Sequence, residues 1–145
     1  TNNGEAEGVF INNDYPIKVI AEMPEGLTLW SGAKEVIPNS TLYLGKLPTK
    51  VDDNVGVIVY SAHIKMKSNP IKTLTNLKRL GVESNRILLI SSICSNKGLN
   101  EIAKIFPQQV IYTSCIDEED DKSNLLKPGI GEPLLRLNTI FLDKN

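Results

Sequence analysis

Two glycines that flank one apolar residue are the part of the chain whose spacing best suits chemistry. The segment 127–131 reads Lys-Pro-Gly-Ile-Gly, and it follows an apolar run that ends near Ser114. Glycine lets the backbone N–H groups of a turn approach a planar ligand or a phosphate closely. We therefore expect Gly129 and Gly131 to belong to a ligand-binding turn.

Charged residues elsewhere suggest anion binding, base catalysis or cation binding. For each of them we also give an interpretation that needs no ligand. Lys65 and Lys67 can attract an anion as point charges, but a solvated basic loop is the interpretation we prefer. His63 is the only histidine of the chain. It is a conceivable general base, although a structural role is commoner for a lone histidine. The acidic run Asp117–Asp121 can bind a hard cation, but we expect a hydrated acidic loop there.

Apolar runs and helical patterns alternate along the chain and must position these residues. Strand-like runs occupy 17–21, 41–44, 55–60, 87–93 and 110–114, and helical spacing occurs over 27–36, 70–80 and 98–106. Such alternation indicates βαβ units and a mostly parallel sheet. We predict an α/β fold with helices flanking the sheet and ligands bound at the carboxyl ends of the strands. Residues 1–14 are expected to be a loose arm or hairpin before one domain over 15–145.

Composition limits the classes of function. The chain has 145 residues, of which 41% are hydrophobic and 23% charged, as in an ordinary globular domain with one core. A net charge of -1 gives no reason to expect binding to nucleic acid or to an acidic membrane. No apolar run approaches the roughly 20 residues that span a bilayer, and no signal peptide is visible. We expect an intracellular protein, in the cytoplasm or in an organelle such as a plastid, with Cys94 and Cys115 as free thiols.

Several segments match one known family in residue pattern and order. Residues 111–117 read Ile-Tyr-Thr-Ser-Cys-Ile-Asp before the glycine turn, and residues 80–88 read Leu-Gly-Val-Glu-Ser-Asn-Arg-Ile-Leu. With the helix and strand over 98–113, these segments resemble the uracil phosphoribosyltransferase family over about 18–139. The resemblance implies a phosphoribosyltransferase-like, Rossmann-like fold. It also implies that the counterparts of the uracil-binding turn are Leu126, Gly129, Ile130 and Gly131.

The loop after the run 55–60 departs from the family's phosphate-binding signature. In the family an acidic residue and Pro lead into Thr-Gly-Gly, whose bare N–H groups at a helix N-terminus hold a phosphate. The counterparts of these positions and their neighbour are Ser61, Lys65, Met66, Lys67 and Ser68. Bulky side chains there obstruct a phosphate, and Pro70 removes one donor from the helix start.

The other loops depart from the family as well. The family's pyrophosphate-binding Arg corresponds to Pro24, and Glu22 and Glu25 on either side of it would repel pyrophosphate. The family's Ala-Pro-Glu-Gly loop corresponds to 95–98, where only the glycine is kept. Its second tail Asp, which helps at the metal and pyrophosphate site, corresponds to Leu135.

The resemblance and the altered loops together suggest three functions. We prefer a non-catalytic, uracil phosphoribosyltransferase-like protein that serves as a structural or regulatory subunit, with other protein subunits as partners and no cofactor. The first alternative is an active enzyme that makes uridine monophosphate (UMP) from uracil and phosphoribosyl pyrophosphate, and that would use Mg²⁺. The second is a sensor that binds a nucleobase or nucleotide without chemistry. No catalytic residue and no metal ligand is assigned.

Overall fold

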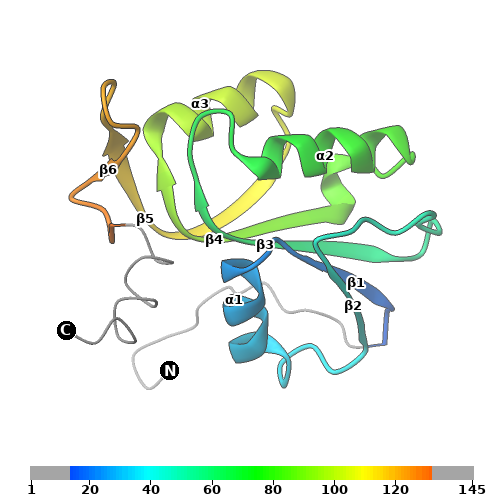
Figure 1. The fold of residues 1–145 in the computed structure, drawn as a ribbon. Helices are drawn as coiled ribbons and strands as arrows, with labels where there is room; N and C mark the ends of the chain where they lie inside the picture. The colour runs from blue at the N-terminus through cyan, green and yellow to red at the C-terminus, as the bar shows by residue number, and fades with distance from the viewer. Residues whose placement is uncertain (1–13, 132–145) are drawn as a thin grey trace, which may run out of the picture.

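Strongly apolar, β-branched runs form the middle of a six-stranded sheet (Figure 1). The computed structural model describes residues 14–131. The strands are β1 (Ile17–Ala21), β2 (Ser40–Leu44), β3 (Gly56–Ile64), β4 (Ile87–Ser95), β5 (Val110–Glu119) and β6 (Leu126–Lys127). Their order is β2-β1-β3-β4-β5-β6, with β1 to β5 parallel and β6 antiparallel to β5. The predicted α/β fold with a mostly parallel sheet is confirmed.

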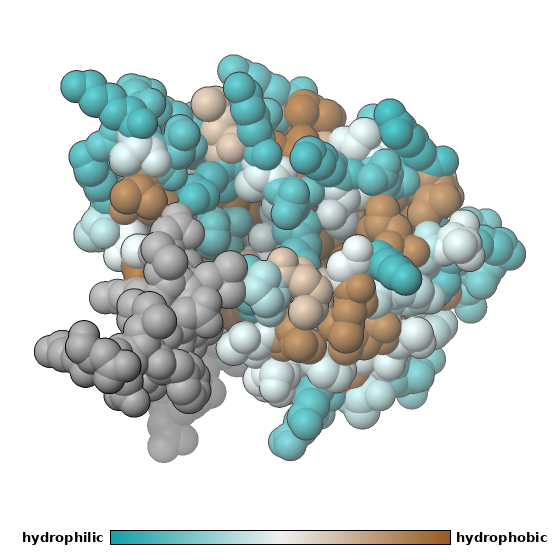
Figure 2. Space-filling model, in the orientation of Figure 1, coloured by the Kyte–Doolittle hydropathy of each residue, from teal (hydrophilic) through white to brown (hydrophobic). Residues whose placement is uncertain are grey.

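Helices cover both faces of the sheet. Helices α2 (Asn69–Arg79) and α3 (Asn96–Ile105) lie on one face, and α1 (Glu25–Ala33) lies on the other (Figure 1). A short 3-10 turn, Ser84–Arg86, leads into β4. Among residues 14–131, no helix is both long enough and apolar enough to cross a membrane. Hydrophobic residues form separate patches among hydrophilic ones on the face that Figure 2 shows.

Two hydrophobic cores hold these layers together. The larger one joins the sheet to α2 and α3, and its fully buried members include Val59, Leu74, Leu77, Leu89 and Ile102. The smaller one joins the sheet to α1 and includes Ile17, Val19, Ile37, Ile58 and Tyr60, with Leu29 and Trp30 packed against it. Cys94 is buried and Cys115 is exposed, and both are free thiols as predicted.

A row of three hydroxyl groups crosses the middle of the sheet. Ser61, Ser91 and Thr113 are paired with one another in β3, β4 and β5. Each hydroxyl donates to the carbonyl two residues further along its own strand, at 3.3, 2.9 and 3.0 Å respectively. Beyond this row the core-facing positions of β3 and β4 change parity, because Val59 and Ile64, and likewise Leu89 and Cys94, belong to the same core although the two members of each pair are five positions apart. We read this as a kink that β3 and β4 share.

Element boundaries differ from prediction where this kink occurs. The sequence predicts that β3, β4 and β5 end at 60, 93 and 114, but the strands continue to Ile64, Ser95 and Glu119. The segment predicted as an acidic loop therefore begins as strand. The helix predicted over 27–36 spans Glu25–Ala33 instead, and Val36 lies outside it with 67% of its surface exposed.

Candidate functional site

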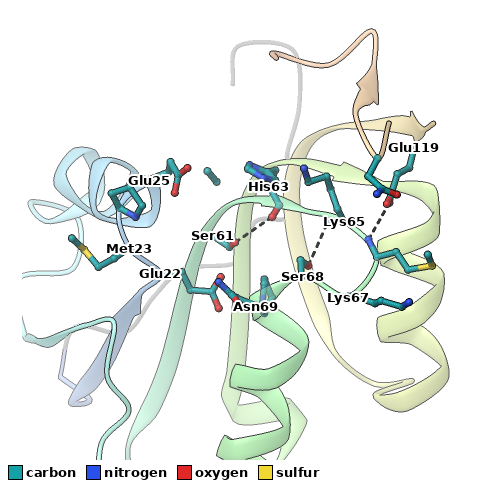
Figure 3. Close-up of a pocket in the computed structure, with 15 residues that line it drawn as sticks. Glu22, Met23, Glu25, Ser61, His63, Lys65, Lys67, Ser68, Asn69 and Glu119 are labelled. Atoms are coloured by element: carbon teal, nitrogen blue, oxygen red, sulfur yellow. Dashed lines mark hydrogen bonds between the residues drawn. The ribbon is translucent and has the colours of Figure 1, made fainter. Parts of the chain in front are cut away.

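A cavity of about 610 Å³ opens at the carboxyl ends of the central strands. Its walls come from the β1–α1 loop, the segment between β3 and α2, and the end of β5. Figure 3 shows Glu22 and Glu25 on the β1–α1 side and Lys67 and Glu119 on the opposite side. The residues that correspond to the family's phosphate loops all line this one cavity: Pro24, Ser61, Lys65, Met66, Lys67 and Ser68.

The β1–α1 loop places a partly buried carboxylate in the cavity. The Glu22 N–H donates to the Tyr60 carbonyl at 2.9 Å, and the Thr73 hydroxyl donates to Glu22 Oε1 at 2.8 Å. Burial raises the pKa of the Glu22 carboxyl above its ordinary value, while the hydroxyls of Thr73 and Ser61 oppose the shift. Burial has the larger effect, so the charged form of this carboxylate is disfavoured in the folded state.

Replacing Glu22 is therefore expected to stabilise the protein at neutral pH. A raised pKa in the folded state means that stability is highest below the unfolded-state pKa near 4.5 and is lost as the pH rises through the folded-state pKa. Glu22→Gln removes that loss while keeping an acceptor for Thr73. Urea denaturation should show a gain in unfolding free energy at pH 7 that shrinks toward pH 4. The exposed Glu35→Gln should show no such pH dependence, and an equal pH response in both variants would contradict the assignment.

The segment between β3 and α2 uses its own backbone donors internally. The Met66 N–H donates to Glu119 Oε2 at 3.0 Å, and the Lys67 N–H donates to Glu101 Oε2 at 2.7 Å. The Ser68 N–H donates to the Lys65 carbonyl at 3.2 Å. These three N–H groups correspond to the family's Thr-Gly-Gly, so the donors that would hold a phosphate already have acceptors within the chain.

Glu119 joins three elements around this segment. Only 6% of the residue is exposed, and its Oε2 also accepts a 2.6 Å hydrogen bond from the Ser95 hydroxyl. Ser95 caps α3 by accepting from the Gly98 N–H at 2.8 Å. Gly98 is required at this position because a Cβ there would lie 2.9 Å from the Ile64 carbonyl oxygen. Sequence reasoning missed Glu101, Glu119 and Ser95 as site residues, although a serine just before an apolar helical pattern is a helix-capping signal.

The acidic run is held by the chain itself and is not the hydrated loop that the sequence predicts. Asp117 accepts from the Gly129 N–H at 2.7 Å, and Asp121 pairs with Lys97. Asp120 accepts from the Lys127 side chain and from the N–H groups of the next turn, which together lower its pKa to about 2. Within residues 14–131, no group of three or more His, Cys, Asp or Glu side chains is placed to hold a metal ion.

The turn that corresponds to uracil binding borders a separate, small hollow that shares His63 and Lys65 with the main cavity. Leu126, Ile130 and Gly131 border a hollow of only about 10 Å³ beside His63 and Ile93. A hollow of this size holds about one water molecule. Gly129 has a φ of +60°, and a Cβ there would lie 2.2 Å from the Leu126 carbonyl oxygen, so the turn requires glycine. Leu135 lies outside the described residues.

The fold and the position of the cavity define an α/β protein of the phosphoribosyltransferase type. The model of the family described as uracil phosphoribosyltransferase matches residues 9–133. The chain therefore belongs to the uracil phosphoribosyltransferase family.

Individual relatives are distant and longer. Uracil phosphoribosyltransferase from Nostoc sp. is 24% identical over 84% of this chain and 64% of its own length. The one from Fervidobacterium nodosum is 28% identical over 88% of this chain and 68% of its own length. The chain thus spans about two thirds of the length of the relatives that it matches. The structure of the AQ2163 protein from Aquifex aeolicus is similar in fold, with a TM-score of 0.67 and 18% identity over 85% of this chain and 64% of that one.

Proposed function

We propose that this protein is a non-catalytic member of its family that acts as a structural or regulatory subunit of a larger intracellular assembly, with other proteins as partners and without a cofactor. The observation that carries the proposal is the hydrogen bonding of the segment before α2. Its Met66 and Lys67 N–H groups bind carboxylates of the same chain. A phosphate would have to displace both carboxylates and then lie beside their charges.

The other wall of the cavity supports the same proposal. Pro24 occupies the position of the family's pyrophosphate-binding Arg, and Glu22 and Glu25 line the cavity around it. A carboxylate next to pyrophosphate adds repulsion where an Arg would add a charge-assisted hydrogen bond. The residues of this cavity therefore do not fit phosphoribosyl pyrophosphate and Mg²⁺, and we derive no reaction step through them.

The fold can persist without chemistry because none of the residues of its two hydrophobic cores lines the cavity. The two hydrophobic cores lie between the sheet and its helices, away from the cavity. Such a domain can keep its shape and surface while the site changes, which is what a scaffold or a regulatory subunit needs.

The direct test is synthesis of UMP. The purified chain, incubated with uracil, phosphoribosyl pyrophosphate and Mg²⁺, is expected to form no UMP above a protein-free blank. The relative from Fervidobacterium nodosum serves as the positive control under the same conditions. UMP formation by this chain would overturn the proposal in favour of an active enzyme.

Thermal unfolding separates the third function from the first. A ligand that binds only the folded state raises the unfolding temperature. We expect no change with uracil or with UMP, because the proposed function includes binding of neither, and the hollow bordered by Leu126, Ile130 and Gly131 measures only about 10 Å³. A rise that saturates with uracil or UMP, without turnover, would replace the scaffold with a nucleobase or nucleotide sensor.

A further inference from the structure

The segment from Lys65 to Ser68 has the features of an anion-binding loop. Two successive N–H groups, of Met66 and Lys67, point to carboxylate oxygens at 3.0 and 2.7 Å. Lys67 has a left-handed backbone with a φ of +58°. Successive N–H groups around a left-handed residue make a concave site for an anion. In this protein the anions at that site are two carboxylate side chains of the same chain.

The two carboxylates reach the loop from different elements. Glu119 lies at the end of β5, 53 positions from Met66, and Glu101 lies on α3, 34 positions from Lys67. Glu119 is buried and is oriented by the Ser95 hydroxyl, so its carboxylate has a fixed place in front of the loop. Figure 3 draws a hydrogen bond that Glu119 accepts at the wall of the cavity.

We infer that Glu119 and Glu101 are built-in ligands of this loop and keep phosphate and similar anions out of it. The inference deepens the proposed function and rests on it. Each N–H can serve one strong acceptor, so a free anion must displace a carboxylate to bind. A displaced carboxylate would remain close by and would repel the anion that had replaced it. The loop therefore excludes free anions in two ways. Its N–H groups already have acceptors, and the two carboxylates repel other anions.

Neutralising both carboxylates should open the loop to inorganic phosphate. The Glu101→Gln/Glu119→Gln double variant keeps the size of both side chains and an oxygen that accepts the N–H bonds, but it removes both charges. We expect a titration with sodium phosphate, followed by ¹⁵N NMR, to shift the Met66 and Lys67 amide signals in a saturable manner. The unaltered chain should show no saturable shift at these two amides, even at phosphate concentrations about tenfold above the Kd of the double variant.

Glu118→Gln provides the matched control. Glu118 precedes Glu119 on β5, its side chain is exposed, and its removal changes the net charge in the same sense. This variant should bind phosphate as weakly as the unaltered chain does. A gain equal to that of the double variant would show that overall charge, rather than the two charges at the loop, controls binding, and would overturn the inference.

Two other results would also overturn it. One is a folded double variant that binds phosphate no better than the unaltered chain, because the carboxylates would then only brace the loop. The other is phosphate binding to the Met66 and Lys67 amides of the unaltered chain. If the double variant does not fold, Glu101→Gln alone tests the inference at the Lys67 amide, since the hydrogen bond between Glu101 and Lys67 is exposed. Neither result concerns UMP synthesis, so failure here is distinct from failure of the proposed function.

Discussion

Gly26→Ala is expected to destabilise the protein by about 3 kcal/mol, because the helix start has no room for a methyl group. A Cβ at this position would lie 2.4 Å from the Tyr60 carbonyl oxygen, a backbone atom in the middle of β3. That oxygen also accepts the Glu22 N–H at 2.9 Å, so it cannot move without disturbing the cavity wall. Thermal unfolding should show a midpoint lower by about 10 °C.

A second glycine of the same helix is the matched control. A Cβ at Gly32 would meet nothing within 4 Å. Gly32→Ala should stabilise the protein by about 0.5–1 kcal/mol, because alanine restricts the unfolded chain and favours helix. A similar loss of stability in both variants would show that the close approach of α1 to β3 does not constrain residue 26.

Ser95→Ala is expected to cost about 3 kcal/mol of unfolding free energy, because one hydroxyl serves two buried partners. About 1 kcal/mol comes from loss of the α3 cap, and about 1–3 kcal/mol comes from leaving buried polar groups unsatisfied. The groups affected are the Gly98 N–H and the Glu119 carboxylate, which lie 2.8 and 2.6 Å from the Ser95 oxygen. Urea denaturation at pH 7 measures the loss.

Ser92→Ala on the same strand is the control for Ser95, and it should change stability by less than about 0.5 kcal/mol because this serine is partly exposed. Combining Ser95→Ala with Glu119→Gln tests the contact itself. Because Gln keeps an accepting oxygen, Glu119→Gln removes only the charge from this contact, and the two changes should be non-additive by about 1 kcal/mol. Additive losses would mean that Ser95 acts only as a helix cap.

Sequence patterns predicted the elements that lie in the middle of the cores. The predicted strand over 17–21 coincides with β1, because its apolar residues are bounded by Pro16 and Glu22. The ends of β3, β4 and β5 were harder to predict. Ser61 interrupts the apolar run of β3 directly after its predicted end at 60, and the acidic residues 117–119 give the last part of β5 the composition of a loop.

The candidate site was predicted in position but not in its hydrogen bonds. Each of the residues matched to the family's phosphate loops lines the observed cavity, because the carboxyl ends of parallel strands meet at one edge of the sheet. The acceptors of the Met66 and Lys67 N–H groups could not be predicted, because Glu119 and Glu101 are distant in sequence. The pairing of β5 with β4 brings Glu119 to the loop, and the packing of α3 against the sheet brings Glu101.

The row formed by Ser61, Ser91 and Thr113 has a consequence for how the sheet assembles. Parallel strands come from distant parts of the chain, and no hairpin turn fixes the register of one strand against the next. The three hydroxyls occupy matching places only when β3, β4 and β5 are paired correctly. A slip of one residue would put the kink of one strand against a straight part of its neighbour. The row therefore favours the correct register of these three strands. Correct pairing in the middle of the sheet also assembles the cavity at the carboxyl ends of the strands.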